Sequence, residues 1–194
     1  MPDLTFAIES VEAAPEVERP DLSVRLRITN GSPGERITSV GLRCQVQIEP
    51  ARRRYSPQEQ TDLSDLFGTP ERWASTMRPL PWSMANATIG AFDTDIVVTI
   101  ALPCSFDLSP GAAKYIAALR EGEIPVSFLF SGTVLYAVGN GPVQFAPIPW
   151  DREAKFRLAL ATGREALARS GANSGWTASN RVLSEHVERC RAGK

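Results

Sequence analysis

The stretch LSVRLRIT, residues 22–29, alternates apolar and polar side chains at every position. This two-residue period is typical of a β-strand that buries one face and exposes the other. The next residues, NGSPG at 30–34, favour a turn because they tolerate positive φ or preset the backbone. Residues 36–51 then repeat the alternation. The two runs predict an antiparallel pair of long strands, and we expect a bulge at Gly41 in the second.

Other parts of the chain carry the same strand signature. Five further runs are predicted as strands: 4–8, 94–102, 124–138, 143–148 and 154–160. The density of β-branched residues in 94–102 predicts a strand buried on both faces. Gly132 interrupts the run 124–138, and the triplet Gly139-Asn140-Gly141 predicts a hairpin turn after it.

Helical features occur in insertions between these strands. Ser56-Pro57-Gln58-Glu59 has the pattern of a capping box with proline at the first helical position, and Gly68 is placed to end that helix. Thr69-Pro70 begins another short helix, and residues 109–122 predict a third. Residues 77–91 carry two of the prolines and are predicted to be partly irregular.

The order of these elements predicts a mainly β (α+β) protein. Strands dominate, and strands and helices do not alternate as they do in parallel sheets, so we expect an antiparallel two-sheet β-sandwich with helical insertions. Residues 1–161 would form this domain. Residues 162–194 lack β-branched runs and predict two C-terminal helices, 162–170 and 177–191, which dock on the same domain or on a partner.

Composition excludes several classes of protein. The 194 residues are 43% hydrophobic and 22% charged, as in ordinary globular chains. The 21 basic and 22 acidic side chains nearly cancel, which argues against a nucleic-acid partner. No apolar run reaches the roughly 18 residues of a membrane span, and no signal peptide is visible. Three widely spaced cysteines do not suit a disulfide framework. We therefore expect a reduced, cytoplasmic protein.

The sequence offers few groups for catalysis. His186 is the only histidine, so the commonest general base and metal ligand is scarce. Cys44 lies on the core-facing side of its strand, and Cys104 is expected to be buried and inert, with a nucleophilic or redox thiol as the alternative. Asp93 and Asp95 share one strand face without evident partners. We expect no catalytic residue, no metal and no cofactor.

One basic cluster, Arg52-Arg53-Arg54 followed by Tyr55, is a candidate binding site because guanidinium groups hold carboxylates and phosphates in bidentate fashion. The alternative is that these arginines form ion pairs with acidic residues just downstream. These residues are Glu59, Asp62, Asp65 and Glu71.

Four further side chains complete the candidate binding set: Glu71, Arg72, Trp73 and Trp82. Trp73 and Trp82 lie beside helix caps or prolines and could anchor an interface, although core packing is the default interpretation of such residues.

Several motifs together resemble an uncharacterised actinobacterial family over most of residues 3–162. The motifs are RRY at 53–55, LFGTPERW at 66–73, LPC at 102–104, AKY at 113–115, GEIP at 122–125, FSGT at 130–133 and PW at 149–150. The family is similar in context to accessory proteins encoded beside nickel–iron hydrogenase genes, which implies an accessory or assembly role. It supplies no catalytic residues to transfer.

Three functional hypotheses remain. The leading one is a non-catalytic cytoplasmic accessory protein that binds a protein partner, as an assembly or chaperone-like factor for a nickel–iron hydrogenase. The second is a small-ligand binder or enzyme that uses Arg54, Glu71, Arg72 and Trp73, which requires them to meet in one pocket. The third is a structural subunit of a large assembly.

Overall fold

The structure, a computed structural model, describes residues 2–14, 21–104 and 109–173. Within these ranges the strands are β1 (Leu4–Ala13), β2 (Asp21–Asn30), β3 (Glu35–Ile48), β4 (Leu80–Ile89), β5 (Asp95–Pro103), β6 (Glu123–Val138) and β7 (Gln144–Ala159). The helical segments are η1 (Pro50–Arg52), α1 (Pro57–Asp62), α2 (Ser64–Phe67), η2 (Pro70–Arg72), α3 (Trp73–Thr76), α4 (Pro110–Ala118) and α5 (Leu160–Asn173).

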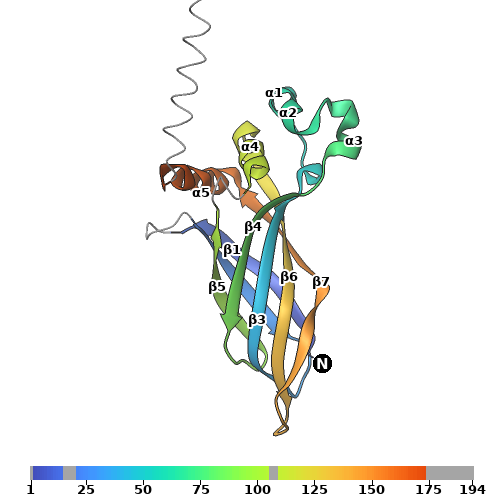
Figure 1. The fold of residues 1–194 in the computed structure, drawn as a ribbon, viewed down its shortest axis with the longest axis vertical. Coiled ribbons are helices and arrows are strands. Elements are labelled where there is room, and N and C mark those ends of the chain that lie inside the picture. Colours follow the sequence, from blue (N-terminus) through green and yellow to red (C-terminus); the bar gives the residue numbers. More distant parts are fainter. Residues whose placement is uncertain (1, 15–20, 105–108, 174–194) are drawn as a thin grey trace, which may run out of the picture.

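The strands form two sheets that pack face to face (Figure 1). One sheet has the order β1-β2-β5 and the other has the order β4-β3-β6-β7, and every neighbouring pair is antiparallel. This arrangement confirms the predicted mainly β, two-sheet sandwich. The alternation of apolar residues explains it, since each strand turns its apolar side to the opposite sheet.

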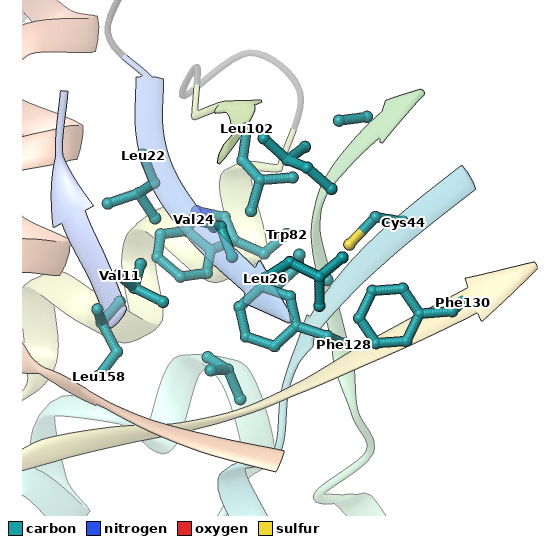
Figure 2. Packing of buried hydrophobic residues seen from close by; sticks show 14 of the residues in the cluster. Val11, Leu22, Val24, Leu26, Cys44, Trp82, Leu102, Phe128, Phe130 and Leu158 are labelled. Carbon is teal, nitrogen blue, oxygen red and sulfur yellow. The ribbon is translucent and has the colours of Figure 1, made fainter. Parts of the chain in front are cut away.

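The core lies between the two sheets and is closed by side chains from both. Figure 2 shows Leu22, Val24 and Leu26 of β2 in one cluster with Phe128 and Phe130 of β6, with Leu26 beside Phe128. These five side chains are almost completely buried. Burial of this kind supplies most of the stabilisation of a sandwich, at about 25 cal/mol for each Å² of apolar surface removed from water.

Two strand predictions are wrong, for related reasons. Residues 80–89, expected to be partly irregular, form the edge strand β4, whose pairing with β3 shifts register between Val46 and Gln47, opposite Pro81 and Ser83. An edge strand with a bulge tolerates proline, which cannot donate a hydrogen bond. Strand β5 is not buried on both faces: it is also an edge strand, and Ile96, Val97 and Val98 are half-buried.

The predicted bulge at Gly41 is also absent, because β3 pairs regularly with both neighbours at that residue. Register shifts in β3 occur instead near Ile37 and Val46. Two glycine predictions are confirmed: Gly132 coincides with the interruption in the β6–β7 ladder, and Gly139 has a φ of 54° in the hairpin turn. The predicted strands 143–148 and 154–160 are one continuous strand, β7.

The helical segments gather at one end of the sandwich, and the β6–β7 turn lies at the other (Figure 1). Helix α5 begins directly after β7 and turns Leu160 and Ala166 into the core. It continues through residues expected to separate two helices, and the second expected helix, 177–191, lies outside the described residues. Among the residues that the structure describes, no helix has the length and apolarity needed to cross a membrane.

The buried cysteines lead to a first prediction. Cys44 and Cys104 are 2% and 1% exposed, and burial raises the pKa of the Cys44 thiol to about 12. A shift of this size from the ordinary value makes the thiolate about 1000-fold rarer at neutral pH. We therefore expect N-ethylmaleimide to modify both residues rapidly in urea and barely at all in the folded protein, measured by peptide mass spectrometry. Equal rates in the two states would contradict the packing.

Candidate functional site

An open groove of about 1090 Å³ lies at the helical end of the sandwich. Its walls come from the segment between η1 and α1, from the turn before β6 and from the last part of β7. Six charged residues matter most in its lining: Arg52, Arg53, Arg54, Arg157, Glu121 and Glu123. We call this feature the arginine groove.

Glu59 also lines the groove, and its carboxylate connects the segment at Ser56 with the segment at Arg120. The residue is 2% exposed, and its carboxylate accepts hydrogen bonds from the backbone N–H of Ser56 at 3.0 Å and of Arg120 at 2.8 Å. The Ser56 side chain in turn accepts from the Glu59 N–H, which completes the predicted capping box. Burial alone would raise the pKa of Glu59, but these N–H donors and the charge of Arg53 hold it below its usual value.

Arg53 is a structural cation in the lining of the groove, and its side chain is 10% exposed. Its Nη2 donates to Glu59 Oε1 at 2.6 Å and to the carbonyl of Glu121 at 2.7 Å, and its Nη1 donates to the carbonyl of Glu123 at 2.9 Å. Gly122, between those carbonyls, has a φ of 83°, a conformation that favours glycine. The single guanidinium therefore ties the insertion to the turn that precedes β6.

Four aromatic rings support the groove from behind. Tyr55 meets Trp73 edge to face at 5.3 Å between centroids and Tyr115 at 6.4 Å, and Phe67 contacts both Trp73 and Tyr115. The Tyr55 hydroxyl donates to the carbonyl of Pro50 at 2.7 Å and lies 2.8 Å from the Tyr115 hydroxyl. Burial raises the pKa of both tyrosines. These contacts hold the rings in place, and Tyr55 is the one of the four that lines the groove.

The other three arginines of the groove are exposed and have no carboxylate within ion-pair distance in the described part of the chain. They are Arg52, Arg54 and Arg157. Of the downstream ion pairs offered as the alternative for this cluster, only that between Arg53 and Glu59 forms. Asp62 pairs with Arg120 instead, at 2.6 Å. Three guanidinium groups are thus left to bind an anion or a carboxylate from outside.

The remaining predicted binding residues do not join the groove. Glu71 and Arg72 are exposed and lie outside its lining, and the Thr69 hydroxyl lowers the pKa of Glu71. Trp73 packs against Tyr55 and donates its Nε1–H to the carbonyl of Gly68 at 2.9 Å. Trp82 is 4% exposed and belongs to the core (Figure 2).

The two aspartates at the beginning of β5, Asp93 just before the strand and Asp95 as its first residue, both form ion pairs. Asp93 pairs with Arg36 at 3.4 Å, and Asp95 pairs with Arg27 at 2.6 Å. Over residues 2–14, 21–104 and 109–173, no group of three histidine, cysteine or acidic side chains is placed to hold a metal ion. His186 lies outside these residues.

Sequence reasoning missed the residues that enter the groove from distant segments. Glu121 and Glu123 flank the Gly122 turn, and Arg157 extends from β7 opposite Pro125. The one local signal was the charged alternation of residues 153–157, which marks an exposed strand face but does not say what that face meets.

Comparison with known proteins identifies the family of this chain but gives no activity. A family model described as a family of unknown function (DUF6084) matches residues 1–194. A search of curated proteins finds no match.

Among solved structures, the CARDB domain of a Pyrococcus furiosus protein in complex with di-metal ions is 13% identical, covers 81% of this chain and 92% of its own, and has a TM-score of 0.32. A Bordetella pertussis protein assigned as ApaA is 15% identical, with coverage of 81% and 94% and a TM-score of 0.26. A β-glucosidase from Kluyveromyces marxianus is 8% identical, with coverage of 80% and 15% and a TM-score of 0.27. These values are too low to transfer any function.

Proposed function

Since the chain belongs to the DUF6084 family of unknown function, we propose its function from the arginine groove: it is a non-catalytic accessory protein that binds a protein partner there. The observation that carries the proposal is a set of three arginines around one open groove, Arg52, Arg54 and Arg157, which make no ion pair within the described residues. Arginine is the cation favoured at protein interfaces, because its planar fork pairs with carboxylates and is weakly hydrated.

The shape of the groove also supports a macromolecular partner. The groove is open to solvent, whereas small-molecule sites enclose most of their ligand and are largely apolar. The lining is dominated by charged groups, which provide specificity and fast association between proteins.

The proposal also names a specific partner. The sequence resemblance to a family encoded beside nickel–iron hydrogenase genes makes a hydrogenase subunit, bound during assembly in the cytoplasm, the partner to test first. In this role the protein would hold or deliver an unassembled subunit without changing it chemically.

The experiment compares partner recovery by two tagged proteins expressed in the native organism. The triple variant Arg52→Glu/Arg54→Glu/Arg157→Glu reverses the charge of the groove, and we expect it to recover at least about tenfold less partner than the wild type, measured by quantitative mass spectrometry. Arg36→Glu is the control, because Arg36 is exposed and lies at the beginning of β3, away from the helical end.

Each outcome decides one part of the proposal. Groove-dependent recovery of a hydrogenase subunit supports both parts. Groove-dependent recovery of another protein supports the accessory function and removes the hydrogenase. If the triple variant and the wild type recover the same proteins in the same amounts, the groove is not the binding site and the proposal is withdrawn.

A further inference from the structure

We propose that the arginine groove binds an extended acidic segment of its partner, with two carboxylates spaced two residues apart held by Arg52 and Arg54. This inference rests on the proposed function, since it names the chemistry that the same groove recognises. It is carried by the backbone at Arg53, by the charges on the rim and by the surroundings of the groove's tyrosine.

The spacing follows from the backbone of the basic cluster. Arg53 is extended, with φ −126° and ψ 153°, and its side chain turns inward to Glu59. In extended chain, side chains alternate in direction and alternate residues lie about 6.6 Å apart. Because Arg53 is extended, the Cα atoms of Arg52, the last residue of η1, and of Arg54 are separated by about this distance, and both residues line the groove. The separation matches that between alternate residues of an extended ligand. An acid-x-acid motif matches them one to one.

The two glutamates in the groove lining favour a peptide over a polyphosphate as the ligand. Glu121 and Glu123 line the same groove as the free arginines, and neither forms an ion pair among the described residues. A polyphosphate would bring further negative charge against these two carboxylates. A peptide avoids this repulsion because its carboxylates can face Arg52, Arg54 and Arg157 while its backbone N–H groups face the glutamates.

The aromatic side chains disfavour a nucleic-acid strand or nucleotide. Binding of unpaired bases relies on free aromatic faces on which the bases stack. Within the described part of the chain, Tyr55 is the one aromatic residue in the groove lining, and its ring already contacts other side chains. The Tyr55 ring makes edge-to-face contacts with Trp73 and Tyr115, and the Arg53 guanidinium lies over the same ring, 5.6 Å from its centroid.

The test is a selection of random decapeptides displayed on phage against the purified full chain. We expect the wild type to enrich acidic residues at positions i and i+2, and the double variant Arg52→Ala/Arg54→Ala to lose that enrichment. Arg36→Ala, the distant control, should keep it. The two groove arginines are exposed and make no ion pair in the described residues, so the variant should fold normally, which circular dichroism and a thermal melt will check.

The best enriched peptide is then synthesised with a fluorescent label, together with a version in which each acid is replaced by its amide. We expect the amide peptide to bind at least about tenfold more weakly by fluorescence anisotropy. Absence of acidic enrichment, or the same enrichment with the double variant, overturns the inference. So does displacement of the peptide by tripolyphosphate at equal concentration, which would reveal a general anion site. Partner recovery that depends on the groove while the peptide selection fails would sink this inference and leave the proposed function standing.

Discussion

Replacing Glu59 by glutamine should lower the free energy of unfolding by about 3 kcal/mol, because it leaves the buried guanidinium of Arg53 without its counter-charge. The side chains of Arg53 and Glu59 are only 10% and 3% exposed, so little water reaches the pair to replace the lost carboxylate. Each oxygen of Glu59 accepts a hydrogen bond from a backbone N–H group. In glutamine an NH2 group replaces one of these oxygens, so that its hydrogens would face an N–H donor and the hydrogen bond would be lost. Urea unfolding at neutral pH, followed by tryptophan fluorescence, measures the change.

The same variant should change the dependence of stability on pH. The pKa of Glu59 is lowered in the folded protein, so the unfolded chain binds the proton first as the pH falls. The stabilisation by Glu59 is complete above the unfolded pKa of about 4.3 and is lost as the pH falls through the lower folded value. The difference between wild type and Glu59→Gln should therefore be largest at neutral pH and shrink in acid.

A matched control variant separates the effect of losing a buried ion pair on stability from the effect of losing an exposed one. Asp62 also belongs to α1 and also contacts an arginine, Arg120, at 2.6 Å, but the Arg120 side chain is 58% exposed. Water and salt screen such a pair, so Asp62→Asn should change stability far less than Glu59→Gln. If the two variants lose the same stability, the Arg53–Glu59 pair does not hold the groove together.

The fold was predictable where one strand face is buried and the other is wet. Residues 22–29 and the long run after the NGSPG turn meet this condition, and they form β2 and β3. Strand β4 is not predictable from the sequence because Pro79 and Pro81 suggest irregular chain. Its pairing depends on the edge that β3 offers. The burial of β5 was overestimated because β-branched residues indicate a strand but not its position in the sheet.

The candidate site was predictable only in its local part. Arg52, Arg53 and Arg54 are adjacent, so the cluster is visible in the sequence, but which one is buried depends on Glu59 and on the carbonyls of a distant turn. Arg157 reaches the same groove because β7 lies beside β6, a relation set by sheet order and not by sequence spacing. Burial of Trp82 likewise follows from the pairing of β4.

Replacing Gly132 by alanine should lower the free energy of unfolding by more than about 3 kcal/mol. Gly132 has a φ of 143°, which side chains rarely adopt, and a Cβ at this position would lie 2.0 Å from the carbonyl oxygen of Gly41 and 3.1 Å from its carbonyl carbon. These are backbone atoms of β3, paired with β6 at this register, so neither can move without separating the central strands of the sheet. Urea unfolding and yield of folded protein provide the measurement.

Gly41→Ala is the matched control, since it places the same methyl group on the facing strand. A Cβ at Gly41 would lie 3.8 Å from the carbonyl oxygen of Thr133, an ordinary contact, and the position is exposed. Alanine also loses less backbone entropy than glycine on folding, so this variant should be neutral or slightly stabilising. The contrast depends on strand register: slippage of β6 by one residue against β3 would turn Gly132 away from Gly41, and the two alanine variants would then behave alike.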